Sequence, residues 1–170
     1  MDESRGLDDV ALDAMRKRLT EILPNQIREC ASHLTEEQIW WRPNDESNSV
    51  GNLILHLSGS MRHYICHSIG GLDYRRDRAA EFSEKGPVSK EALLLAFEDT
   101  IQQIIATFQS FDKTRLLEPG AEPSYLPTIF DQIYGASMHM SLHAGQIIFI
   151  TKMFQAGAID EIWKKAHNLK

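Results

Sequence analysis

The chain has 170 residues, of which 42% are hydrophobic and 25% are charged, with only ten glycines and six prolines. This length and balance fit one globular domain over residues 1–170 and exclude a disordered chain. The net charge of −6 provides no general positive field, so we expect neither a nucleic-acid partner nor a membrane partner.

The N-terminus and the cysteines indicate a cytoplasmic protein. The chain opens on the charged residues 1–5 rather than on the apolar run of a signal peptide. Cys30 and Cys66 form no CxxC pair and lie among apolar neighbours, so buried, reduced thiols are expected.

Residues 8–33 carry apolar side chains at helical spacing and predict the first helix. Pro24 interrupts this pattern and lacks a backbone donor, which predicts a kink or a restart near residue 25. The residue before a proline avoids the helical region, so residues 40–43 are predicted to leave the helix end in an extended conformation.

A second helix is predicted from residue 48 or 49, where Asn48 or Ser49 can cap it, to about residue 69, before a glycine pair. This helix carries His56 and His63. The connection at residues 71–88 is polar and charged, so we expect an irregular segment that crosses the end of the fold or covers a site. Its basic cluster, residues 74–78, is interpreted as a solvated loop.

Two further helices are predicted at residues 89–111 and 128–156, joined by a proline-rich connection at residues 119–127. A short closing helix is expected within residues 159–170. The fourth helix has no charged side chain between Asp131 and Lys152, but its histidines, serines and glutamines argue against a membrane span. It is best interpreted as the central, buried helix of an all-α bundle.

His139 and His143 are four residues apart on this helix, so their imidazoles project from one face, one turn apart. Two histidines at this spacing can bind one metal ion. They can equally form hydrogen bonds in the core or lie at a contact between subunits. A buried imidazole without a partner costs free energy, which favours a ligand role. A third ligand from another helix would complete the site, and His56 is the candidate.

The sequence resembles the DinB-like (YfiT-like) four-helix metalloprotein superfamily, in particular a branch catalogued as a domain of unknown function. Four segments carry the resemblance: Leu34 to Pro43, Asn48 to Leu57, Thr128 to Gln132, and the HxxxH-x-GQ run from His139 to Ile147. Together these segments span most of the chain, in the order and spacing of the family.

The resemblance implies that His56, His139 and His143 bind one divalent metal ion, with positions left open for water or substrate. It also implies an up-down-down-up four-helix bundle with long connections, and a homodimer. Ala144 departs from the pattern, since relatives commonly have a second consecutive histidine there, so roles tied to that residue are not transferred.

Imidazole ligands suit several metals, and zinc or nickel is expected. An open coordination position is typical of a catalytic site acting on a small-molecule substrate. Characterised relatives suggest a transferase that works with a low-molecular-weight thiol. A metal-dependent hydrolase that activates water is an alternative, and a non-enzymatic metal-binding or ligand-binding module is another.

Three other residues have expected roles around this site. His63, two turns after His56, is the candidate proton shuttle of a hydrolase. Asn52 and Gln146 lie one turn from predicted ligands and could orient them or a substrate. The thermolysin-like HExxH is absent because Met140 occupies the glutamate position, and no nucleophile elbow, phosphate loop or dinucleotide fingerprint occurs.

Overall fold

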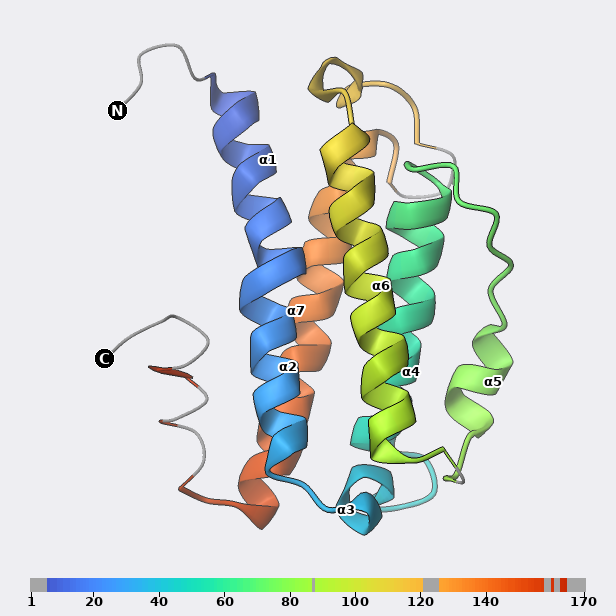
Figure 1. Cartoon of the computed structure of the whole chain (residues 1–170), viewed down its shortest axis with the longest axis vertical. Coiled ribbons are helices and arrows are strands. Elements are labelled where there is room, and N and C mark those ends of the chain that lie inside the picture. The colour runs from blue at the N-terminus through green and yellow to red at the C-terminus, as the bar shows by residue number, and fades with distance from the viewer. Residues whose placement is uncertain (1–5, 87, 121–125, 158–159, 161–162, 165–170) are drawn as a thin grey trace.

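The computed structural model describes residues 6–86, 88–120, 126–157, 160 and 163–164, and this part of the chain is helical, without strands. Four long segments form the bundle (Figure 1): α1 (Leu7–Lys17) with α2 (Leu23–Ser32), α4 (Val50–Met61) with the π-helical turn that continues it (Arg62–His67), α6 (Lys90–Ser110) and α7 (Ile129–Phe154). The second of these, residues 50–67, is called the α4 segment. Shorter elements lie in the connections: α3 (Glu36–Trp40), α5 (Arg78–Ser83) and a 3-10 turn (Lys113–Arg115).

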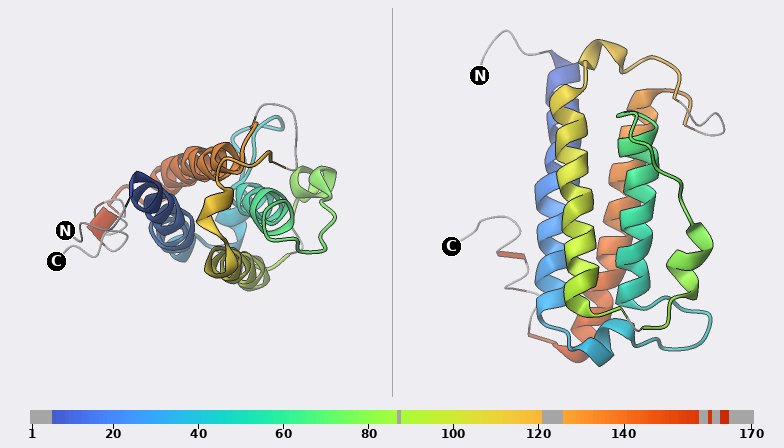
Figure 2. Two further views of the ribbon diagram at one scale, coloured as in Figure 1. Left: turned by 90° about the horizontal axis from the view of Figure 1, so that it is seen from above. Right: turned by 45° about the vertical axis from the view of Figure 1, so that its right-hand side comes forward.

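The helices run in the predicted up-down-down-up order, because α1–α2 and α7 point one way and α4 and α6 point the other way (Figure 1). Since α4 and α6 are parallel, the chain must return along the bundle between them. This crossover, residues 68–89, carries α5 along the outer side of α4 (Figure 2). α4 therefore lies between α5 and the rest of the bundle.

Capping side chains mark the helix starts at positions that the sequence had indicated. The Ser49 hydroxyl accepts a hydrogen bond from the Asn52 backbone amide at the start of α4, and Thr128 accepts one from Asp131 at the start of α7. Ser89 caps α6 in the same way. Each cap satisfies a backbone donor that has no partner within its helix.

The sequence predicts a kink or a restart near residue 25, and the structure has a change of helix type just before it, with α2 beginning at Leu23. A π-helical turn (Arg18–Ile22) joins α1 to α2, and the Leu23 amide donates to the Arg18 carbonyl. Proline is tolerated in the first turn of a helix, and Pro24 occupies that position in α2. The wider turn thus absorbs the missing donor without breaking the helical path.

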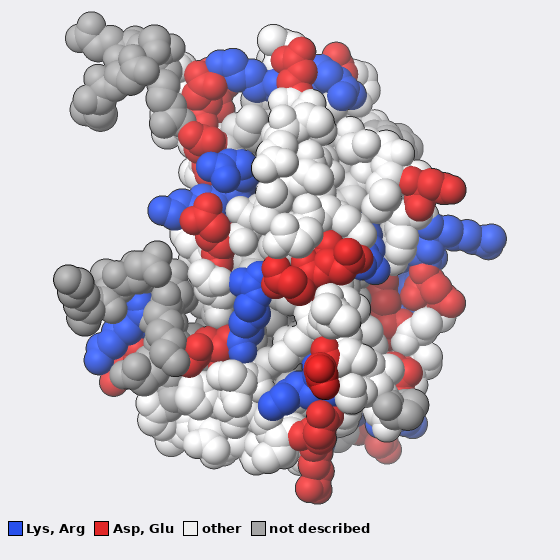
Figure 3. Space-filling view, viewed as in Figure 1, with Lys and Arg blue, Asp and Glu red and all other residues white. Residues whose placement is uncertain are grey.

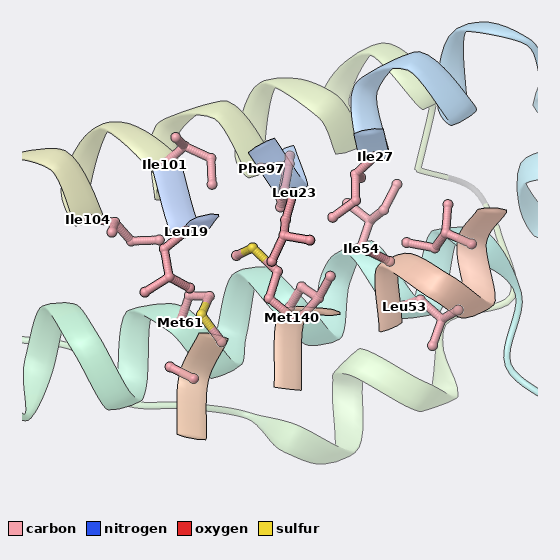
Figure 4. Packing of buried hydrophobic residues seen from close by; sticks show 14 of the residues in the cluster. Leu19, Leu23, Ile27, Leu53, Ile54, Met61, Phe97, Ile101, Ile104 and Met140 are labelled. Atoms are coloured by element: carbon pink, nitrogen blue, oxygen red, sulfur yellow. The ribbon is translucent and has the colours of Figure 1, made fainter. Parts of the chain in front are cut away.

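Buried apolar side chains from all four long segments meet along the bundle axis (Figure 4), among them Leu19, Ile54, Phe97 and Met140. Each of these four is at most 1% exposed. Truncating such a side chain to alanine typically costs about 2–5 kcal/mol of stability. This core holds α4 and α7 in register, and the candidate site depends on that register.

Some boundaries differ from expectation. The connection at residues 71–88 is not wholly irregular, since it contains α5, and α7 ends at Phe154, two residues before the predicted end. The closing helix predicted within residues 159–170 falls mostly outside the described residues.

None of the described helices combines the length and the apolar character needed to cross a membrane. On the face seen in Figure 3, basic and acidic side chains are interspersed.

Candidate metal centre

The structure brings together the three histidines that the sequence singled out. His56 lies near the middle of α4, while His139 and His143 lie one turn apart on α7, which runs antiparallel beside α4. The ring centroid of His56 is 4.9 Å from that of His139 and 5.0 Å from that of His143. The centroids of His139 and His143 are 4.5 Å apart, so the three rings form a compact triangle.

The ring nitrogens converge as ligands of one ion would. The Nε2 atoms of His56 and His139 are 2.9 Å apart, and one nitrogen from each of the three rings lies within 4.8 Å of the others. Nitrogens bound at about 2.1 Å to one ion lie roughly 3–3.5 Å from each other. The three-histidine group could therefore hold a metal ion after only small side-chain movements.

A buried carboxylate orients His56 from the other side of its ring. Glu81 of α5 is 7% exposed, and its Oε2 lies 2.8 Å from His56 Nδ1. Arg76 donates to both carboxylate oxygens of Glu81, at 2.7 and 2.8 Å. Its Nη2 also lies 3.1 Å from His56 Nδ1, but both groups cannot share one ring nitrogen. Because the carboxylate is nearer and charged, Nδ1 carries the proton and donates it to Glu81, which leaves Nε2 for a metal.

The basic cluster at residues 74–78 is therefore not simply a solvated loop, because its Arg76 is half-buried in this network. Burial alone would raise the pKa of Glu81. The hydrogen bonds from Arg76 and His56, together with the charge of Arg76, outweigh burial and lower the pKa below its ordinary value. Glu81 is thus an anion at neutral pH beside His56, and it would partly balance the charge of an ion bound to the three imidazoles.

Asn52 and Gly59 allow α5 to sit against α4. The Asn52 side chain donates to the backbone carbonyls of Glu81 and Glu84, at 3.0 and 2.9 Å. A methyl group on Gly59 would collide with the Glu81 carboxylate, so this glycine permits the close approach. The sequence predicts that Asn52 orients a ligand or a substrate. Its hydrogen bonds to the backbone at residues 81 and 84 place it where it positions Glu81, the partner of His56.

Gln146 lies where it can orient His143. Its Oε1 is 2.6 Å from His143 Nδ1, on α7 itself. An amide oxygen only accepts hydrogen bonds, so His143 donates from Nδ1 and keeps Nε2 for a ligand role. Two of the three rings thus have a partner that selects the same tautomer.

The imidazoles on α7 are biased toward their neutral form. Burial lowers the pKa of His139 to about 4, and the neighbouring His143 and His56 add to the effect. Burial also lowers the pKa of His143 below its ordinary value. Since only a neutral imidazole can bind a metal, both rings are ready as ligands at neutral pH.

A cavity of about 650 Å³ opens beside the triangle, between α4, α7 and the crossover. Its wall includes His56, Ser60 and Tyr64 from the α4 segment, Arg76 and Arg78 from the crossover, and Gln132, Ala136, Met138 and His139 from α7. The cavity gives a small molecule access to two of the candidate ligands.

His63, the candidate proton shuttle, lies outside the described lining of this cavity. Its ring centroid is 4.8 Å from that of Tyr64 and 5.9 Å from that of His67, on the same helical segment. Ser60 and Tyr64, rather than His63, line this part of the cavity wall.

Sequence reasoning missed Glu81, Arg76 and the buried Gln132. Glu81 follows His56 by 25 residues, in a segment without periodic apolar residues, so no local pattern links the two. For Gln132, the sequence shows one polar residue near the start of the fourth helix and gives no sign that its side chain is buried. The alternation of charges around residues 76–81 is the sole signal that could have suggested a folded segment there.

A family model described as "Protein of unknown function (DUF1572)" matches residues 9–164 of this chain. No curated protein sequence matches it. Among solved structures, a similar fold occurs in the crystal structure of a conserved protein from Enterococcus faecalis, with a TM-score of 0.60 and 14% sequence identity. The likeness covers 86% of this chain and 94% of that one, and at this identity it supports the fold alone.

Proposed function

This chain belongs to the DUF1572 family, and from that premise we propose that it is a divalent-metal enzyme of the DinB-like superfamily, a transferase that works with a low-molecular-weight thiol. The observation that carries the proposal is the convergence of three imidazoles, two of which, His56 and His139, line a cavity. His56, His139 and His143 would hold the ion. When bound, a zinc or nickel ion would lower the pKa of a thiol and polarise an electrophile.

The wall of the cavity favours a thiol over water as the nucleophile. Among the described lining residues there is no aspartate or glutamate that could take a proton from water. Arg76 is paired with Glu81, but Arg78 presents positive charge to the cavity and would favour an anionic sulfur. In such a transfer the thiol loses its proton to solvent, sulfur forms a bond to the electrophilic carbon, and the leaving group departs with its electron pair.

Metal content tests the centre itself. We expect about one zinc or nickel ion per chain in the wild type by elemental analysis, and loss of that ion in His56→Ala and His143→Ala. His63→Ala is the matched control, because His63 is on the α4 segment but outside the triangle, and it should keep its metal. A wild type that stays metal-free after reconstitution would refute the proposal.

Turnover tests the reaction class. The metal-loaded protein is expected to accelerate conjugation of glutathione, cysteine or pantetheine to 1-chloro-2,4-dinitrobenzene, followed by absorbance. Cleavage of 4-nitrophenyl acetate without any thiol would instead identify a hydrolase. A firmly bound ion with neither reaction would leave a binding module as the function.

A further inference from the structure

The cavity beside the metal centre extends along α4 and α7, away from the three histidines. On α7 its wall runs from His139 back to Gln132, seven residues earlier. At 1.5 Å per residue the two positions are about 10 Å apart along the helix. The cavity is thus long enough for a small molecule with one group at the metal and another near Gln132.

Gln132 is unusual among the lining residues because its polar atoms are buried without partners. The residue is 0% exposed, and neither Nε2 nor Oε1 forms a hydrogen bond within the described part of the chain. A buried polar group without a partner typically costs about 1–3 kcal/mol of stability. The fold tolerates this cost at the wall of its candidate site.

The helix does not need this amide. The start of α7 is capped by Thr128 and Asp131, and the backbone amide of Gln132 donates to the Thr128 carbonyl. The carboxamide packs on Gly120, where an added methyl group would lie 2.9 Å from Oε1. Gly120 is itself held by a hydrogen bond to the Pro127 carbonyl. The amide is therefore held in place, with a donor and an acceptor unused.

We propose that Gln132 is a specificity-determining residue that binds a neutral amide group of the substrate. A carboxamide or peptide amide offers one donor and one acceptor, which matches the two unused atoms of Gln132. A charged group is disfavoured there, because the cationic lining residues Arg76 and Arg78 belong to the opposite end. Arg76 contacts His56, and Arg78 lies over Phe82, whose ring packs on His56.

The inferred ligand has a polarity along its length. The end of the ligand that binds the metal carries a negative charge, or gains one by losing a proton. This end lies beside Arg76 and Arg78. Its middle contacts Ala136 and Met138, and its far end carries the amide at Gln132. This assignment names a substrate class for the proposed metal centre, and its position in the cavity rests on that proposed function.

Metal-anchored probes test the assignment. Alkyl hydroxamates bind zinc or nickel at one end, and a series of chain lengths ending in a carboxamide would reach toward Gln132. In the wild type we expect one length to bind at least about tenfold more tightly than the same chain ending in an isopropyl group, by calorimetry. A carboxylate end should bind more weakly than the carboxamide.

Substitutions test whether Gln132 is the residue that causes the preference for the carboxamide. Gln132→Leu should abolish the preference for the carboxamide while it keeps the metal and the affinity for acetohydroxamate, which is too short to reach residue 132. It should also unfold at the same or a higher temperature than the wild type, since it removes an unpartnered buried amide. Gln102→Leu makes the same change on the surface of α6 and should keep the preference.

A metal-free measurement separates the two proposals. The side-chain amide resonance of Gln132 in the wild type, assigned by its loss in Gln132→Leu, should shift when hexanamide is added. If acetohydroxamate fails to bind but hexanamide shifts this resonance, the metal function falls and the amide site stands. If acetohydroxamate binds, while no chain length prefers the carboxamide and the resonance does not move, the assignment of Gln132 is wrong. Marked destabilisation by Gln132→Leu would likewise make this side chain structural.

Discussion

At the scale of single residues, the candidate centre depends on groups that do not themselves reach the ion. Glu81 and Gln146 each accept a hydrogen bond from the Nδ1 atom of a candidate ligand. Such partners fix the ring orientation and the tautomer, and they raise the basicity of the ligand nitrogen. The two partners differ in charge. Glu81 places a negative charge close to His56, whereas Gln146, the partner of His143, is neutral.

Replacing Glu81 by glutamine should therefore weaken metal binding without removing it. The change keeps the size of the side chain but removes its charge and one strong acceptor. We expect metal affinity to fall about 10- to 100-fold, measured by competition with a chromogenic chelator. Glu91→Gln, at an exposed position in the first turn of α6, should bind metal as the wild type does. Equal affinities in all three proteins would show that Glu81 does not tune the site.

The lowered pKa of His139 predicts how the metal-free protein responds to pH. In the folded state this pKa is about 4, below its ordinary value of 6.5. Between these values the unfolded chain binds a proton at His139 and the folded chain does not, so acid favours unfolding. The free energy of unfolding, from urea denaturation, should decrease as the pH falls from about 6.5 to about 4. His139→Asn should reduce this dependence, and an identical slope in both proteins would contradict the assigned shift.

At the scale of elements, α5 is the part of the fold most closely tied to the site. It has only six residues, and isolated helices of that length are unstable in water. Its position follows from Asn52, which binds its backbone, and from Glu81, which faces Gly59 of α4. α5 is thus a helix whose stability comes from the element it covers.

Substituting Gly59 by alanine should displace α5 and uncouple it from the metal centre. An added methyl group would overlap the Glu81 carboxylate, which is held by Arg76 and cannot move freely. We expect weaker metal binding and faster hydrogen exchange in residues 78–83, while the bundle stays folded. Gly145→Ala is the matched control on α7, because nothing lies within 4 Å of its added methyl group. It should keep the wild-type affinity and gain up to about 1 kcal/mol of stability from helix propensity.

At the scale of the whole molecule, the prediction that α7 is the central helix, buried all round, is wrong, because α7 presents an apolar face to the outside as well as to the core. Tyr134, Met138, Leu142, Phe149 and Met153 are each more than half exposed, on a helix without charged side chains between residues 131 and 152. A contiguous exposed apolar surface is typical of a protein interface. The homodimer expected from the sequence remains a prediction, and this face is where we place it.

A charge on this face should break the dimer. We expect the wild type to have the mass of two chains by light scattering, and Phe149→Glu to shift it toward one chain, because a buried, unpaired carboxylate opposes association. Leu95→Glu changes a residue of similar exposure on α6, away from this face, and should leave the mass unchanged. A monomeric wild type would contradict the prediction.

Much of the fold was predictable because it rests on local rules. Helical spacing of apolar residues, capping residues such as Ser49 and Thr128, and the glycine pair after the second helix act within a few residues of one another. The four long helices therefore appear close to their predicted positions. The same locality makes the pair of His139 and His143 visible, since four residues are one helical turn.

The sequence by itself thus determined the all-helical class, the four long helices and the histidine pair on α7, because periodicity and capping are properties of neighbouring residues. Only the tertiary structure decided that α5 forms, that Glu81 and Arg76 stand behind His56, and that Gln132 is buried without a partner beside the same cavity. These features depend on contacts between segments 20 or more residues apart, or on a wall assembled from several elements. Such contacts exist only once the core has brought α4 and α7 together, and no pattern along the chain encodes them.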